Sequence, residues 1–95
     1  MLSLPNLFNF AGYCIYFWSN ESGEPIHVHV SVKRPSNQST KFWLLKDGSV
    51  ELANNHAELS RKSIKRLSFF ITQNYNFILA AWKNYFEVDS INFYK

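Results

Sequence analysis

Hydrophobic and polar residues repeat with two different periods along this chain, which predicts strands in its first half and helices in its second. Residues 12–18 form an aromatic and β-branched run without a charged break, as a buried strand does. Residues 26–33 alternate, so that the apolar residues face one side of a strand while His27 and His29 face the other. One face of this strand is therefore expected to join the core, and the other to display two imidazoles.

A hairpin is predicted next. Residues 40–45 begin a third strand, Asp47-Gly48 supplies the positive φ angles of a tight turn, and residues 50–53 return as a short fourth strand. Because strands joined by tight turns run in opposite directions, the predicted sheet is antiparallel and has three to four strands.

Helical periodicity begins after the hairpin. Three residues are suitable N-caps for a first helix: Asn54, Asn55 and Ser60. From Arg61 onward, apolar residues recur every three to four positions on one face. A second amphipathic stretch covers residues 75–86, after an interruption at Asn74 and Asn76.

These elements predict a single α+β domain over residues 1–95. A small antiparallel sheet over about residues 12–53 precedes two C-terminal helices, over about residues 56–87, that pack on one face of the sheet. The tail, residues 88–95, alternates weakly and is expected to add an edge strand or to project toward another chain.

Composition excludes several classes of protein. With 46% hydrophobic and 18% charged residues, three Gly and three Pro, the chain is neither disordered nor collagenous. Its one cysteine, Cys14, cannot form an internal disulfide and is expected to be a buried thiol. The longest apolar stretch, Leu7 to Trp18, is shorter than the roughly 20 residues of a membrane span. We therefore expect a cytoplasmic protein without a membrane partner.

Positive charge is concentrated in the middle of the chain. The net charge is +3, but the segment from Lys33 to Arg66 holds eight basic and three acidic residues, a net of +5. Phe69 projects among the basic residues of the first predicted helix, which is typical of a partner-binding surface. The alternative is that the second helix or the N-terminal segment covers Phe69. The predicted binding residues are Lys33, Arg34, Lys41, Arg61, Lys62, Lys65, Arg66 and Phe69.

His27 and His29 are the candidate catalytic pair, because residues i and i+2 of a strand project to the same side with Cα atoms roughly 6.5–7 Å apart. They could bind a divalent metal ion, for which His56 or Glu51 would be the third ligand. Without a metal, two imidazoles beside basic residues could cleave RNA by general acid and base catalysis. The third interpretation is a polar strand face without chemistry. No cofactor is predicted apart from that metal ion.

A family resemblance joins these features. The aromatic strand with Tyr16-Phe17, the Pro25-x-His27-x-His29 element, the turn at Asp47-Gly48 and the helix with Leu79-x-x-Trp82-x-x-Tyr85 resemble a small bacterial family of domains of unknown function, number 4160 of that series. The resemblance covers roughly residues 10–86. Members often carry Leu-Pro before the first helix, where this chain has Ala53-Asn54-Asn55-His56.

The resemblance implies a two-gene unit, in which a second small protein is the cognate partner, of the kind suspected to be toxin–antitoxin modules. Our leading hypothesis is therefore a component of such a module that binds a protein partner, with RNA as a further target. The alternatives are a non-catalytic protein-binding module or homodimer, and a metal-dependent hydrolase that uses His27 and His29. Whether the protein is an enzyme stays open at this point.

Overall fold

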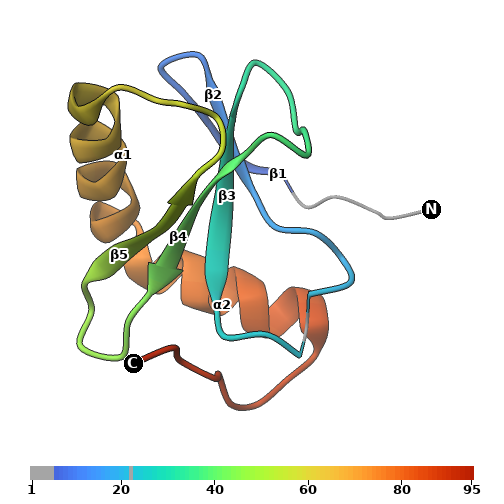
Figure 1. Ribbon diagram of the computed structural model, residues 1–95. Coiled ribbons are helices and arrows are strands. Elements are labelled where there is room, and N and C mark those ends of the chain that lie inside the picture. The colour runs from blue at the N-terminus through green and yellow to red at the C-terminus, as the bar shows by residue number, and fades with distance from the viewer. Residues whose placement is uncertain (1–5, 22) are drawn as a thin grey trace.

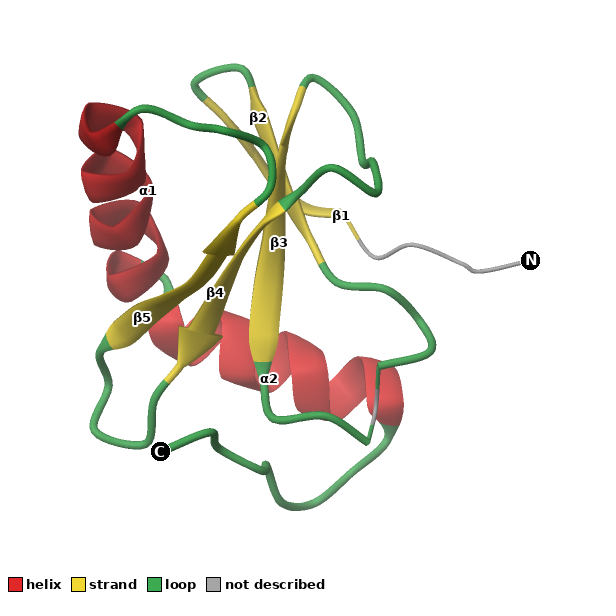
Figure 2. Cartoon of the chain, viewed as in Figure 1, coloured by secondary structure: helices red, strands yellow, loops and turns green. Residues whose placement is uncertain are grey.

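In a computed structural model, which describes residues 6–21 and 23–95, the chain folds as a five-stranded antiparallel sheet followed by two helices (Figure 1). The strands lie in the sheet in chain order, and both helices follow the last strand (Figure 2). The α+β class is confirmed, but the predicted number of three to four strands is wrong. The elements are β1 (Asn6–Phe10), β2 (Tyr13–Tyr16), β3 (His27–Val32), β4 (Thr40–Leu44), β5 (Val50–Asn55), α1 (Arg61–Gln73) and α2 (Tyr75–Phe86).

The strand that the sequence analysis missed is β1, which pairs with β2 in a tight hairpin. Ala11 and Gly12 form its turn with φ angles of 52° and 85°. Two consecutive residues with positive φ match the right-handed twist of the strands on either side of such a turn. Gly12 therefore belongs to the turn and not to the first predicted strand, and the apolar run on either side of it divides into two strands.

The hydrophobic core lies on one face of the sheet. Both helices bury side chains against this face, as predicted. The fully buried core residues include Ile15, Val28, Val30, Phe42 and Leu44 from the strands, and Leu67, Ile71 and Ile78 from the helices. The alternation of β3 places its valines in this core, except that Val32 at the end of the strand is 52% exposed.

Local capping explains where the helices begin and end. The Ser60 side chain accepts a hydrogen bond from the Ser63 amide at 3.1 Å, so Ser60 is the N-cap of α1 among the three predicted candidates. Asn74 separates α1 from α2, and its side chain donates to the Phe70 carbonyl at 2.9 Å. Glu87 ends α2 in the left-handed conformation that is common after a helix.

The second face of the sheet is covered mainly by loops and by the C-terminal tail, and α2 also contributes an aromatic side chain to it. The Tyr94 ring stacks on Trp43 with 4.8 Å between ring centroids, and the Ile26 amide donates to the Asn92 carbonyl at 2.9 Å. The tail therefore forms no edge strand, and that prediction is wrong, whereas its contact with another chain stays a prediction. This face carries the histidines of β3.

Candidate functional site

His27 and His29 project from β3 on the side opposite the core, as their alternation with the valines predicts. The expectation that this face displays them to solvent is wrong: His27 is fully buried and His29 is nearly so. Their rings lie edge to face, 5.0 Å apart between centroids. Trp43 and Trp82 enclose His27, and the ring of Tyr16 stacks on His29. Aromatic side chains thus seal the pair on several sides.

A carboxylate completes the cluster, and it comes from the loop between β2 and β3. Glu21 is buried, with its Oε1 3.0 Å from His27 Nε2 and its Oε2 2.8 Å from His29 Nε2. The Trp18 amide also donates to Oε1 at 2.8 Å. One atom from each of these three side chains lies within 4.8 Å of the others, which is a set that could hold a metal ion. We call Glu21, His27 and His29 the Glu–His–His cluster.

The other nitrogen of each imidazole has its own partner. His27 Nδ1 lies 2.9 Å from the Pro25 carbonyl oxygen, and His29 Nδ1 lies 2.9 Å from the Ser39 hydroxyl. A carbonyl can only accept, so His27 Nδ1 carries a hydrogen and donates it. These contacts orient both rings so that the Nε2 atoms converge on the carboxylate.

The electrostatics of the cluster favour an ionised Glu21. Burial raises the pKa of the carboxyl group, but its contacts with His27, His29 and the Trp18 amide outweigh burial and hold the pKa well below its usual value. The His29 contact is a hydrogen bond. The His27 contact has the distance of an ion pair, but it lacks the alignment of a hydrogen bond, so His27 Nε2 is a buried nitrogen without a hydrogen-bond partner among the described residues.

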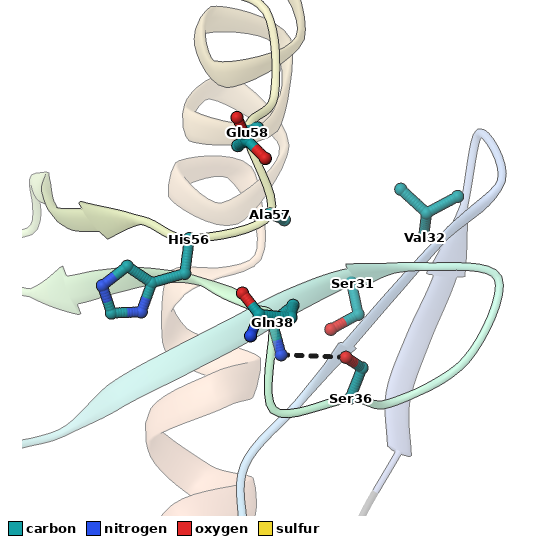
Figure 3. Close-up of a pocket in the computed structure, with 7 residues that line it drawn as sticks. All are labelled: Ser31, Val32, Ser36, Gln38, His56, Ala57 and Glu58. Carbon is teal, nitrogen blue, oxygen red and sulfur yellow. Dashed lines mark hydrogen bonds between the residues drawn. The ribbon is translucent and has the colours of Figure 1, made fainter.

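The two residues proposed from the sequence as third metal ligands lie elsewhere. Glu51 pairs with Lys95 Nζ at 3.1 Å. His56 is exposed on the connection between β5 and α1, beside a pocket of about 410 Å³ that Ser31 and Ser36 also line (Figure 3). The sequence did not indicate the third member of the cluster, because Glu21 lies in a polar loop, where acidic residues are common. Its distance of six and eight residues from the histidines carries no known motif.

The predicted basic residues separate into three places. Lys41 lies opposite His29 in the sheet, but its Nζ pairs with Glu24 at 3.3 Å and lies 4.2 Å from the centre of the Trp43 ring. Lys33 and Arg34 are exposed after the end of β3. The other four, all exposed, lie on α1: Arg61, Lys62, Lys65 and Arg66. The structure therefore does not bring the basic residues together around the histidines.

Phe69 is 67% exposed on α1, so the alternative in which α2 or the N-terminal segment covers it is wrong for the described residues. It lines a groove of about 560 Å³ between α1 and β1. Phe10 and Phe70 stack at 4.0 Å between centroids within this groove, and the Arg66 guanidinium lies 5.3 Å from the Phe10 ring centre. We call this feature the Phe10–Phe69 groove; its lining is Phe10, Lys62, Lys65, Arg66, Phe69, Phe70 and Gln73.

Comparison with known proteins gives a family but no characterised relative. No curated protein and no solved structure matches the chain. None of the helices in the described part of the chain is long and apolar enough to cross a membrane. The model of the family described as a domain of unknown function (DUF4160) matches residues 12–83, which is more than half of the chain, and the protein therefore belongs to this family.

Proposed function

We propose that this protein is the binding component of a two-protein module, and that it holds an acidic segment of its small partner protein in the Phe10–Phe69 groove. The observation that carries this proposal is the exposure of Phe69 beside an apolar groove whose rim carries Lys62, Lys65 and Arg66. Large exposed aromatic side chains next to basic ones are typical of the centre of protein interfaces, where they supply most of the affinity.

The charge of α1 selects the kind of partner. This helix has four basic residues and no acidic one over Arg61–Gln73. An uncompensated positive face attracts an acidic surface, accelerates the encounter and disfavours basic partners. We therefore expect the partner segment to place carboxylates near Lys62, Lys65 and Arg66.

The volume and lining of the groove suggest which side chains of the partner segment lie between those carboxylates. Its volume of about 560 Å³ and its phenylalanine lining suit apolar side chains from the partner. An amphipathic helix with apolar residues on one face and acidic residues beside them would satisfy both the groove and its rim. RNA is less well suited, because a phosphate backbone matches the basic rim but leaves most of the apolar lining without a ligand.

The test uses the protein encoded by the neighbouring gene as the probe. Isothermal titration calorimetry of the two purified proteins should give one complex of fixed stoichiometry. Phe69→Ser should weaken it by about 30-fold or more, since an aromatic residue at the centre of an interface contributes roughly 2 kcal/mol or more. Reversing the charges of Lys62 and Lys65 to Glu should also weaken the complex, mainly through slower association.

Matched controls lie elsewhere on the surface. Val32→Ser removes an exposed apolar side chain outside the groove, and Lys83→Glu reverses an exposed charge on α2, so neither should change the affinity. Equal affinity of the wild type and Phe69→Ser would refute the groove as the binding site. A second outcome would also refute a protein partner: no protein complex forms, and a single-stranded RNA binds tightly with an affinity that falls steeply as salt is added. RNA would then be the ligand of the groove.

Two alternative functions would each give a distinct experimental result. A homodimer through Phe69 would sediment as a dimer at high concentration and become monomeric in Phe69→Ser. A metal-dependent hydrolase centred on His27 and His29 would show phosphodiester hydrolysis that depends on added metal and on both histidines. Neither histidine is presented openly to a macromolecule, because His27 is fully buried and the His29 side chain is 11% exposed, so RNA cleavage by the pair stays a prediction with less support than protein binding.

A further inference from the structure

We propose that the Glu–His–His cluster is a binding site for one divalent transition-metal ion, and that Zn²⁺ matches its ligands best. This site is separate from the Phe10–Phe69 groove and would stand if the groove proved to have no partner. Two segments of the chain build it: Glu21 from the loop between β2 and β3, and His27 and His29 from β3.

The orientation of the ring nitrogens of His27 and His29 supports metal binding. Histidines that bind a metal through Nε2 usually donate their Nδ1 hydrogen to a carbonyl, a carboxylate or another outer partner, which sets the tautomer and the ring orientation. His27 has such a partner in the Pro25 carbonyl, and His29 has the Ser39 hydroxyl, which can accept from Nδ1 once a metal ion replaces the hydrogen on Nε2. Both Nε2 atoms are thereby turned toward the same carboxylate.

The Nε2 atom of His27, which has no hydrogen-bond partner among the described residues, also supports a metal ion. Since Nδ1 carries the hydrogen, Nε2 of a neutral His27 presents a lone pair, and its nearest polar neighbour is the acceptor Glu21 Oε1 at 3.0 Å. Two acceptors face each other in a buried site, where no hydrogen bond joins them. A cation between them removes the repulsion and satisfies both atoms.

No basic side chain in the described part of the chain supplies this cation. Among the described residues, Glu21 has no lysine or arginine within ion-pair distance, and the nearby Lys41 is engaged by Glu24 and Trp43. The remaining choices are a proton on His27 or a metal ion. A metal ion would bind His27, His29 and Glu21 at once, whereas a proton on His27 would join only His27 Nε2 and Glu21 Oε1.

The ligand types and distances favour zinc. Two imidazoles and one carboxylate are a known catalytic zinc set, in which the fourth position is left for water. With bond lengths of about 2.0–2.2 Å, the ligand atoms of a tetrahedral zinc site are separated by roughly 3.3 Å. The carboxylate oxygens lie 2.8–3.0 Å from the two Nε2 atoms, and one atom from each of the three side chains lies within 4.8 Å of the others, so small shifts of the ligands would bring the cluster to the zinc spacing. Glu21 can shift more easily than the histidines, because it lies in a loop and they lie in β3.

The experiment is zinc binding by the full-length protein, produced without a polyhistidine tag and stripped with a chelator. Calorimetry with ZnCl₂ should show one ion per chain, and titration with Co²⁺ should produce the visible absorption bands of a low-coordinate imidazole and carboxylate site. Zn²⁺ should also raise the melting temperature, because an ion that binds the folded state stabilises it. Absence of saturable zinc binding in the wild type would overturn the proposal.

Two variants separate this site from adventitious binding. Glu21→Gln keeps the size of the side chain but removes its charge, and it should weaken zinc binding by about 100-fold, at least as much as the loss of an outer hydrogen-bond partner. His56→Ala removes the third histidine of the chain, which is exposed and outside the cluster, and should leave the affinity unchanged. Zinc binding that survives Glu21→Gln and disappears in His56→Ala would overturn the proposal.

The folding of each variant is measured separately from its zinc affinity. Circular dichroism of metal-free Glu21→Gln establishes whether the sheet is intact. If this variant does not fold, His29→Gln takes its place, and the cobalt spectrum of the wild type still reports the ligands directly. A spectrum without imidazole coordination in the wild type would count against the site whatever the variants do.

Discussion

The Glu–His–His cluster and the Phe10–Phe69 groove belong to opposite faces of the sheet and differ in the properties that decide what can bind. The cluster is buried and polar, and its atoms are held at hydrogen-bond distances by the Pro25 carbonyl and the Ser39 hydroxyl. The groove is open and apolar, with charge only on its rim. A closed polar site suits a small ion, whereas an open apolar one suits a macromolecule, so one small domain can offer two unrelated kinds of binding.

The two regions also differ in their expected contribution to stability. The cluster connects the loop between β2 and β3 to the sheet, whereas Phe69 contributes little buried area. Mutations in the cluster should therefore lower the free energy of unfolding more than they change binding at the Phe10–Phe69 groove, and mutations of the groove rim should do the reverse. The predictions below test this contrast.

Removal of the Glu21 carboxylate should have the largest effect. Glu21→Ala removes the acceptor of the His29 hydrogen bond and of the Trp18 amide, and each buried polar group left without a partner costs about 1–3 kcal/mol. Urea denaturation monitored by circular dichroism measures the change. Glu51→Ala is the matched control, because its ion pair with Lys95 is largely exposed and should cost less than about 1 kcal/mol. Equal losses in the two variants would contradict a special role for the cluster.

Acid should weaken the metal-free protein through the same carboxylate. Glu21 has a pKa held below its unfolded value of about 4.3, so its stabilising contribution is complete above that value and is lost as the pH falls toward the folded pKa. The free energy of unfolding should thus decline from about pH 5 downward. The part of the decline that Glu21 causes cannot exceed the loss in Glu21→Ala, and Glu21→Gln should remove that part. A Glu21→Gln variant with an unchanged pH profile would assign the acid sensitivity to other groups.

Loss of the outer partner of His29 should have an intermediate effect. Ser39→Ala removes the hydroxyl that lies 2.9 Å from His29 Nδ1 but leaves all three ligand atoms in place. Zinc affinity should fall by about 10–100-fold, which is the usual effect of such a loss. Ser49→Ala, which removes a hydroxyl bound to Asp47 in a distant turn, should leave the zinc affinity unchanged in the same titration.

Loss of the exposed ring of Phe69 should have the smallest effect on folding. Phe69→Ser changes a side chain that is 67% exposed, so the free energy of unfolding should change by no more than about 0.5 kcal/mol. Phe70→Ala is the comparison within the same groove: its ring packs against both Phe8 and Phe10, and its loss should cost clearly more. If Phe69→Ser unfolds the protein, the ring has a structural role that its exposure does not suggest.

The elements that the sequence predicted well are those with local causes. Alternation in β3, the Ser60 cap, the break at Asn74 and the Gly48 turn all depend on residues close together in the chain. The hairpin turn of β1 is also local, but Ala11 is an unusual residue at positive φ and does not signal a turn. The tail was misjudged because its contacts, Tyr94 on Trp43 and Asn92 on Ile26, join parts of the chain that are far apart.

By itself, the sequence determined which residues share a face: the periods of strands and helices are properties of the backbone, so His27 and His29 had to project together, and Phe69 had to lie among basic residues. The tertiary structure alone decided what those residues meet. Glu21 reaches the two imidazoles because the loop after β2 folds back over the sheet, and Phe69 remains open because α2 packs elsewhere. Such contacts depend on long-range packing, which no local pattern specifies.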